Sequence, residues 1–207
     1  MKNRNLLIIS TAFAVVLIFI SCGKNYSPEE GKYIAEIQKF RQEKDEYMKS
    51  DSNSPFNSRV KVEFTPLKYF DPDPGFVFKS KLYEYEKKDT IIIFGTKGEE
   101  RNAVRYGYVK CNYDGKDYIV NVYEGVTKGG EKYFSIWFTD KTTGKETYGV
   151  GRYIDFEVDH DKNFIYTIDF NLAYNPYCAY SPGYSCAIPS KEDHIELAIE
   201  AGEKSFH

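Results

Sequence analysis

From residue 59 onward, apolar side chains alternate with polar ones between short turns, and this alternation most limits how the 207-residue chain can fold. Val60, Val62 and Phe64, for example, are separated by charged residues. A repeat of two places neighbouring side chains on opposite faces of a strand, so that one face can be buried while the other meets water. We therefore expect a mainly β fold.

The predicted strands are short and follow one another closely. Besides residues 60–64 they cover 76–81, 82–86, 90–94, 102–112, 118–123, 133–139, 147–158 and 164–170. Asp114-Gly115 favours a tight hairpin turn because both positions tolerate positive φ. Strands joined by such turns form an antiparallel meander, which we expect to close as a barrel or to fold as a sandwich.

One amphipathic helix is expected before the strands and a loop-rich strap after them, which makes the class α+β. The apolar residues of the helix recur at spacings of three, four and seven, namely Tyr33, Ile34, Ile37, Phe40 and Tyr47. Ser27 supplies an N-cap and Pro28 a first helical residue, so the helix is predicted from 28 or 29 to 49, covering one open end of the barrel. Prolines and glycines replace the alternation after residue 170, and this predicts the strap, with a short strand or helix at 195–201.

The first 21 residues have the pattern of a lipoprotein signal peptide. Lys2 and Arg4 precede an apolar run that ends at Cys22. We expect cleavage before Cys22 and transfer of diacylglycerol to its thiol, with an amide-linked acyl chain such as palmitate as a second lipid anchor. Residues 22–31 would then be a tether, and residues 32–207 a single β-rich domain. The alternative is an uncleaved anchor helix, although the apolar run is shorter than a membrane span.

The expected location is the cell envelope. Lipidated Cys22 would anchor the protein in a membrane, and Gly23 in place of an aspartate predicts the outer membrane if the host is Gram-negative. The net charge is −3, so the chain offers no basic surface for nucleic acid, and a small molecule or a protein is the expected partner. Aromatic residues make up 17% of the chain, which suits strands and also surfaces that stack on sugars or bind proteins.

Two cysteines near the C-terminus favour a local disulfide. Cys178 and Cys186 enclose a turn-forming Pro-Gly pair, and an exported protein meets oxidising surroundings. Two alternatives stay open: both cysteines bind a metal together with His194, or Cys178 is a nucleophile with His194 or His160 as its base. The spacing does not match a paired-cysteine metal motif, so neither a metal nor a cofactor is predicted. Cys111 would be left as a free, half-buried thiol.

Two carboxylates, Asp155 and Asp169, lie near the ends of neighbouring predicted strands, where they could share a proton or bind a cation. The interpretation we favour is that Asp169 caps the turn into Asn171 and that Asp155 pairs with Arg152. These residues would then hold the fold together instead of acting as catalysts.

A polar turn at residues 159–163 would make the strands on either side of it hairpin partners. Arg152 would then face Phe170, and Asp155 would face Thr167. In this register the Arg152 guanidinium could reach the side chain of Asp169 or of Asn171 at the barrel mouth.

Long motifs occur at residues 67–70, 138–155, 169–180 and 201–204, the third of which reads DFNLAYNPYCAY. Together they resemble the bacterial family called domain of unknown function 1684, over residues 33–206. The resemblance implies no established activity, substrate or cofactor. The site residues that it implies are Arg152, Asp155, Asp169, Asn171, Tyr174, Asn175, Cys178 and Cys186. The chain departs from the family pattern at Ala187, Ser190 and Asp193, the last of which replaces an asparagine.

The leading hypothesis is a lipid-anchored envelope protein whose β domain binds a small ligand or an envelope partner at the barrel mouth, under residues 174–184. The alternative is a hydrolase that uses Cys178 or the pair Asp155 and Asp169, with Arg152 stabilising an anion. A third hypothesis is a purely structural protein, in which carbonyls or Asp169 satisfy Arg152. The sequence assigns neither a catalytic residue nor a substrate.

Overall fold

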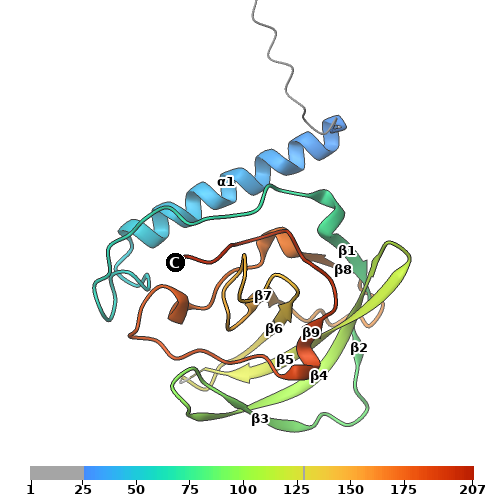
Figure 1. Cartoon of the computed structure of the whole chain (residues 1–207). Coiled ribbons are helices and arrows are strands. Elements are labelled where there is room, and N and C mark those ends of the chain that lie inside the picture. Colours follow the sequence, from blue (N-terminus) through green and yellow to red (C-terminus); the bar gives the residue numbers. More distant parts are fainter. Residues whose placement is uncertain (1–25, 128) are drawn as a thin grey trace, which may run out of the picture.

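The computed structural model describes residues 26–127 and 129–207 (Figure 1). The expected signal peptide, the lipid site at Cys22 and residues 22–25 of the tether lie outside these residues. Within the described ranges, no helix is long and apolar enough to cross a membrane.

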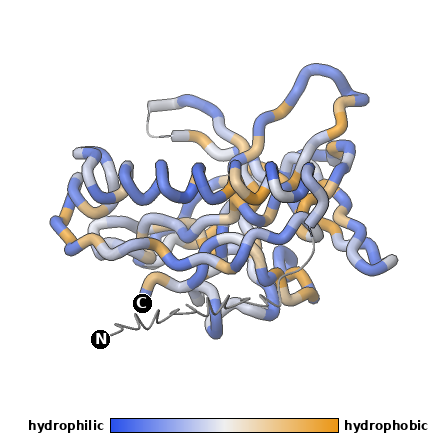
Figure 2. The backbone as a smooth tube through the Cα atoms, turned by 90° about the horizontal axis from the view of Figure 1, so that it is seen from above, coloured by the Kyte–Doolittle hydropathy of each residue, from blue (hydrophilic) through white to orange (hydrophobic). Residues whose placement is uncertain are grey.

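The first element, α1, is the amphipathic helix expected from the sequence and spans Pro28–Ser50. It begins with a capping box, in which the Glu30 N–H donates to Ser27 Oγ at 3.2 Å and the Ser27 N–H donates to Glu30 Oε2 at 2.8 Å. These bonds satisfy backbone donors that the start of a helix leaves free. Figure 2 shows α1 as mainly hydrophilic, and the helix buries Ile37 and Met48. It therefore lies on the surface of the domain with a narrow apolar face turned inward.

The β part of the fold consists of a larger and a smaller sheet. The larger sheet has seven strands, in the order β2-β4-β5-β6-β7, with β3 beside β4 and with β9 parallel to β6. The smaller sheet pairs β1 with β8 in antiparallel register. The strands are β1 (Val77–Ser80), β2 (Tyr83–Glu84), β3 (Thr90–Phe94), β4 (Glu100–Tyr113), β5 (Lys116–Val126), β6 (Lys132–Asp140), β7 (Arg152–Phe156), β8 (Tyr166–Asp169) and β9 (His194–Ile195). Single 3₁₀ turns lie at η1 (Pro74–Phe76), η2 (Phe170–Leu172), η3 (Tyr177–Ala179) and η4 (Lys191–Asp193).

The predicted hairpin at Asp114-Gly115 is confirmed. Both residues have positive φ, +50° and +74°, and they join β4 to β5. The mainly β class with a single N-terminal helix is confirmed as well. Residues 195–201 contribute only the end of β9, and the remainder of the strap is irregular apart from its 3₁₀ turns.

The larger sheet stays open and does not close as a barrel. The free edge of β7 is taken by the strap, because Tyr153 and Tyr174 exchange two backbone hydrogen bonds of 2.9 Å each. The strand β8 belongs to the smaller sheet, so the predicted β7–β8 hairpin is wrong. The expected cross-strand neighbours that this overturns are Arg152 with Phe170 and Asp155 with Thr167.

The middle of the larger sheet is buried on both faces. On one face, Ile136 and Phe138 pack into the main core together with side chains of β1 and β8. On the opposite face, Ser135 and Trp137 are buried, and Trp137 stacks on Tyr123 at 4.9 Å between ring centroids. The larger sheet is therefore covered on both faces, as in a sandwich. The strap forms part of the cover on the face opposite the main core.

The end of α1 packs on an apolar cluster of its own. Its buried members are Met48, Phe56, Leu67, Tyr180 and Phe206. Val62 and Phe64 pack against this cluster from an irregular segment, so the strand predicted at 60–64 is wrong. The alternation of these residues serves packing against Phe56 and not a ladder of hydrogen bonds. The helix thus covers the C-terminal segment, as Figure 1 shows, and not the end of a barrel.

Candidate ligand-binding groove

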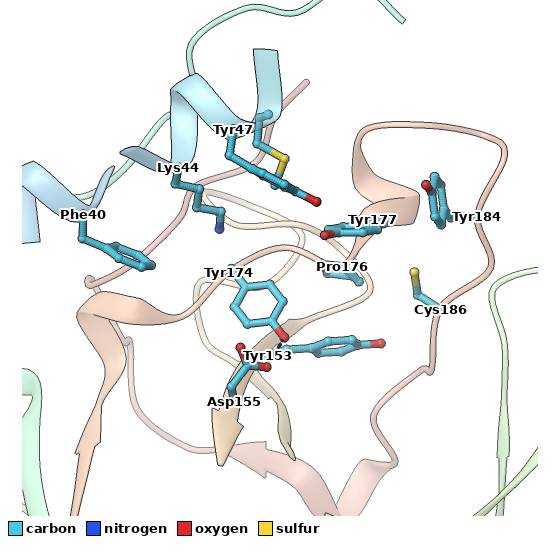
Figure 3. A pocket seen from close by; sticks show the side chains of 11 residues that line it. Phe40, Lys44, Tyr47, Tyr153, Asp155, Tyr174, Pro176, Tyr177, Tyr184 and Cys186 are labelled. Atoms are coloured by element: carbon cyan, nitrogen blue, oxygen red, sulfur yellow. Dashed lines mark hydrogen bonds between the residues drawn. The ribbon is translucent and has the colours of Figure 1, made fainter. Parts of the chain in front are cut away.

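The sheet face opposite the main core carries a cleft of about 400 Å³ against α1. The aromatic side chains that line it come from the helix, from β7 and from the strap, namely Phe40, Tyr47, Tyr153, Tyr174, Tyr177 and Tyr184. Figure 3 shows the ring of Tyr174 beneath Lys44 and Tyr47, with Tyr177 and Tyr184 beyond it. Three segments far apart in sequence thus meet at this cleft.

Two further hollows continue the cleft across the sheet. A hollow of about 230 Å³ shares Tyr153, Asp155 and Tyr174 with the cleft and adds Tyr133 and Trp137. A wider hollow of about 800 Å³ then shares Tyr133 and Trp137 with the second one. Because neighbouring hollows share walls, we treat the three as one aromatic groove.

The alternation of side chains along β6 and β7 places the groove residues on one face. Trp137 pairs with Tyr153 and Ser135 pairs with Asp155 across the two strands. These odd-numbered residues all point away from the main core, since successive side chains of a strand point to opposite faces. The backbone bonds between Tyr153 and Tyr174 then set the strap along the edge of β7 as the groove wall.

Asp155 is the carboxylate at the centre of the groove. The Tyr174 hydroxyl donates to Asp155 Oδ1 at 2.6 Å, which Figure 3 shows as a dashed line. Burial raises the pKa of Tyr174, and the negative charge of Asp155 raises it further, so the hydroxyl stays a proton donor. Asp155 is exposed, and among the described residues its Oδ2 atom receives no hydrogen bond. The favoured pairing of Asp155 with Arg152 is therefore wrong, because the two side chains point to opposite faces of β7.

Arg152 lies in the main core, where neither it nor its partner Asp140 exposes more than 1% of the side chain. Its Nη2 atom donates to Asp140 Oδ2 at 2.6 Å and to the Ile199 carbonyl at 3.0 Å, and Nη1 donates to the Ala201 carbonyl. The guanidinium does not reach Asp169, so the contact predicted from the hairpin register is wrong. Arg152 instead ties the C-terminal segment to β6 and β7.

Asp169 and Asn171 connect β8 to the helix and to the loop before β1. Asp169 Oδ1 accepts from the Asn171 N–H at 2.8 Å, so the predicted cap is confirmed. Both carboxylate oxygens of Asp169 also accept from the Tyr33 hydroxyl, at 2.9 and 2.8 Å. The Asn171 side chain exchanges two hydrogen bonds of 2.8 Å with the backbone of Asp73. These contacts are structural, and they lie apart from the residues that line the groove.

Sequence reasoning missed Glu203, a fully buried carboxylate. Its oxygens accept from Asn175 Nδ2 at 2.8 Å, from Lys44 Nζ at 3.1 Å and from the Tyr180 hydroxyl. A buried charge is tolerated only with such partners. Its position in the last of the family-like motifs was the available signal. Asn175 is thereby explained as a structural residue and not as part of the groove.

Asp193, which replaces an asparagine of the family pattern, accepts four hydrogen bonds. The donors are Asn121 Nδ2 at 2.9 Å, the Tyr123 hydroxyl at 2.7 Å, and the N–H and hydroxyl of Ser190 at 2.8 and 2.6 Å. A carboxylate suits an environment of donors, whereas an amide would turn an NH₂ group toward one of them. The departure from the pattern thus fits its surroundings in this chain.

Cys178 and Cys186 are free thiols, so the structure does not contain the expected disulfide. The Cys178 N–H donates to Cys186 Sγ at 3.2 Å, and a hydrogen bond joins the two thiols. They are therefore neighbouring free thiols and not a disulfide. Cys111 is fully buried in the main core, not half-buried as predicted, and burial raises its pKa to about 12.

The histidines do not join the cysteines. His194 Nδ1 lies 3.0 Å from Thr139 Oγ1, and its Nε2 lies 3.3 Å from Glu196 Oε1. Across the residues that the structure describes, no group of three or more His, Cys, Asp or Glu side chains could hold a metal ion. Cys178 has the hydroxyl of Tyr148, at 3.9 Å, as a neighbour of its sulfur.

Fold and site together define an α+β protein with an open antiparallel sheet and an aromatic groove between sheet, strap and helix. The chain belongs to the family described as protein of unknown function (DUF1684), whose model matches residues 62–204. A solved structure, the uncharacterized protein from gene locus rrnAC0354 of Haloarcula marismortui, is similar to it with a TM-score of 0.61 and 28% sequence identity. The match covers 85% of this chain and 96% of that one. No curated protein matches the chain.

Proposed function

We propose that this protein is a lipid-anchored envelope protein that binds an uncharged saccharide chain in the aromatic groove. The observation that carries the proposal is the placement of one carboxylate, Asp155, among aromatic rings from three separate segments. Ligand sites are concave, mostly apolar, and carry a few placed polar groups. The groove has each of these properties.

The rings favour a ligand with flat apolar faces. Tyr133 is 41% exposed where the second and third hollows meet, and Phe40 is 43% exposed in the cleft against α1. A sugar ring has C–H groups on its face, and these pack against the face of an aromatic ring. The length of the groove, which runs through three connected hollows, suits several linked rings better than a single one.

The polar groups favour hydroxyls over charges. Lys44 already pairs with Glu203 at 3.1 Å, and Arg101 already pairs with Glu99 at 2.5 Å. Both cations that line the two hollows around Asp155 are thus already paired, whereas Arg59 and Lys97 line only the widest hollow, so we expect an uncharged ligand beside Asp155. Asp155 Oδ2 remains as an acceptor for a ligand hydroxyl. An aliphatic ligand would leave Asp155 Oδ2 without a hydrogen-bond donor.

The geometry favours neither a hydrolase nor a purely structural role for every motif residue. Asp169 is engaged in structural contacts, so it does not support Asp155 as a second catalytic carboxylate. Arg152 is likewise engaged in structural contacts, so it does not serve as an anion-binding cation beside Asp155. The structural role fits Arg152, Asp169 and Asn171. It does not account for Asp155 and Tyr174, which meet in the groove wall.

The test is calorimetric titration of the full chain, in a detergent without a sugar headgroup, with chitotriose, maltotriose and cellotriose. Binding of at least one trisaccharide is expected, and Tyr133→Ala should weaken it. Tyr83→Ala is the matched control, because Tyr83 is 39% exposed on β2, outside the groove. Choline serves as the cationic probe. Binding of choline in place of every trisaccharide, or equal effects of the two tyrosine variants, would refute the proposal.

A further inference from the structure

Two free thiols meet beside the aromatic groove, and the proposed ligand makes no use of them. Cys178 lies in η3, and the chain returns through Gly183 to place Cys186 against it. Both are partly exposed, and Cys186 lines the groove beside Tyr184, as Figure 3 shows. The pair is therefore reachable from solvent, in contrast to Cys111.

The backbone around the pair is fixed on both sides. The Cys186 N–H donates to Thr96 Oγ1 at 3.2 Å, and the Cys186 carbonyl accepts from the Thr96 N–H at 2.9 Å. Cys178 sits in a 3₁₀ turn closed by a 2.8 Å bond from the Ala179 N–H to the Pro176 carbonyl. The two sulfurs thus stay neighbours without help from a covalent bond.

The two thiols have unlike surroundings. Cys178 Sγ receives hydrogen bonds from the Cys186 thiol and from the Tyr148 hydroxyl, the latter at 3.9 Å. The bond from Cys186 lowers the pKa of Cys178 to about 6, against the opposing effect of burial. The same bond and burial raise the pKa of Cys186. The pKa of Cys178 is thus lowered and that of Cys186 raised, which is the direction that separates an attacking from a resolving thiol.

We propose that Cys178 and Cys186 form a thiol–disulfide exchange site that opens on the groove and reacts with organic disulfides. The Cys178 thiolate attacks one sulfur of a disulfide RSSR, forming Cys178–S–SR and releasing RS⁻. Cys186 then attacks the Cys178 sulfur, releases the second RS⁻ and gives up its proton to a thiolate. The net result is one protein disulfide, one RSH and one RS⁻, which can take from solvent the proton that Cys178 had released, with two electrons passed from protein to RSSR.

This inference goes beyond saccharide binding and does not depend on it. The Cys178–Cys186 disulfide expected from the sequence would then be the oxidised state of this pair. Tyr148 is assigned a positioning role, because its hydroxyl donates to the Cys178 sulfur and takes part in neither bond-forming step.

The test uses oxidised glutathione with the full chain at neutral pH, followed by peptide mass mapping. We expect Cys186→Ser to accumulate a glutathione adduct at Cys178, wild type to form the Cys178–Cys186 disulfide with release of glutathione, and Cys178→Ser to do neither. Near-UV circular dichroism shows whether each variant is folded. Equal labelling of the two single variants, or an unmodified wild type whose urea-unfolded form reacts, would overturn the proposal.

A second measurement separates reactivity from mere exposure. The rate of iodoacetamide alkylation of Cys178, located by peptide mass mapping in reduced protein that retains Cys186, is followed against pH with and without Tyr148→Phe. Loss of the Tyr148 hydroxyl should move the pH of half-maximal rate upward and slow the reaction severalfold at neutral pH. Cys111 is the internal control and should react only after unfolding. An unchanged pH profile would remove Tyr148 from the site, and a profile typical of a free cysteine would refute the exchange site.

Discussion

Arg152 Nη2 lies 2.6 Å from Asp140 Oδ2, in an ion pair that is almost completely closed to solvent. The pair joins the two strands of the β6–β7 hairpin from within the core, and the same guanidinium binds carbonyls of the C-terminal segment. Burial lowers the pKa of Arg152, and Asp140 opposes this effect. Arg152 therefore stabilises the fold, whereas Asp155, on the opposite face of the same strand, lines the groove.

Arg152→Met should destabilise the protein strongly, because it leaves the Asp140 carboxylate buried without its partner. A loss of about 3–5 kcal/mol in the free energy of unfolding is expected. Urea denaturation of wild type and variant measures it. The double variant with Asp140→Asn should recover part of the loss, since the uncompensated charge is then gone. A loss below about 1 kcal/mol for the single variant would show that the pair is not buried as described.

Gly151, next to Arg152, has a φ of +108°, and a Cβ atom there would lie 2.5 Å from the Phe138 carbonyl oxygen. Gly151→Ala should therefore cost about 1–3 kcal/mol of stability or more. Gly31→Ala is the matched control, because Gly31 lies within α1 and a Cβ atom there meets open space. It should stabilise the protein by about 0.5–1 kcal/mol, since alanine is the better helix former. Thermal denaturation of both variants checks the sign, and equal signs would contradict the prediction.

Asp155→Asn should weaken saccharide binding by about 10- to 100-fold, because the hydrogen bond to a charged acceptor is lost. Its effect on stability should stay within about 0.5 kcal/mol, as expected of an exposed residue. Tyr174→Phe should weaken binding less, since it removes only the hydroxyl that holds Asp155 Oδ1. Calorimetric titration measures affinity and urea denaturation measures stability. A large loss of stability in Asp155→Asn would assign this residue to the fold instead.

Glu99, on the rim of the groove, should make stability depend on pH. Hydrogen bonds from Ser185 and Arg101 lower its pKa from 4.5 to about 2. Because the folded pKa lies below the unfolded one, the contribution is present above about pH 4.5 and is lost as pH falls toward about 2. Wild type should therefore lose its advantage over Glu99→Gln in this window. The effect should be small, since Glu99 is exposed. Melting temperatures of both proteins across the window test this, and parallel curves would contradict it.

The elements with strong local signals could be predicted from the sequence. The N-cap at Ser27 and the Asp114-Gly115 turn depend on residues within a few positions of one another, and both are confirmed. The segment 60–64 has the same alternation as a strand, yet it packs as an irregular chain on Phe56. Alternation reports that one side is buried, and it does not report whether a hydrogen-bonding partner is present.

The candidate site divides in the same way. Asp169 as the cap of Asn171 is a local interaction and could be predicted. The partners of Arg152 could not, because Asp140 and the carbonyls of Ile199 and Ala201 come from separate segments.

The sequence by itself determined the helix, the hairpin of β4 and β5 and the family, because capping, turn chemistry and long motifs act over short stretches of chain. Only the tertiary structure decided which segment lies along the edge of β7. The backbone at that edge can accept any strand, so the choice between β8 and Tyr174 depends on which arrangement buries side chains better elsewhere. Pairing β8 with β1 places Ile168 and Phe78 in the main core. The edge of β7 at Tyr153 is then free to pair with the strap. The aromatic groove exists because of that choice.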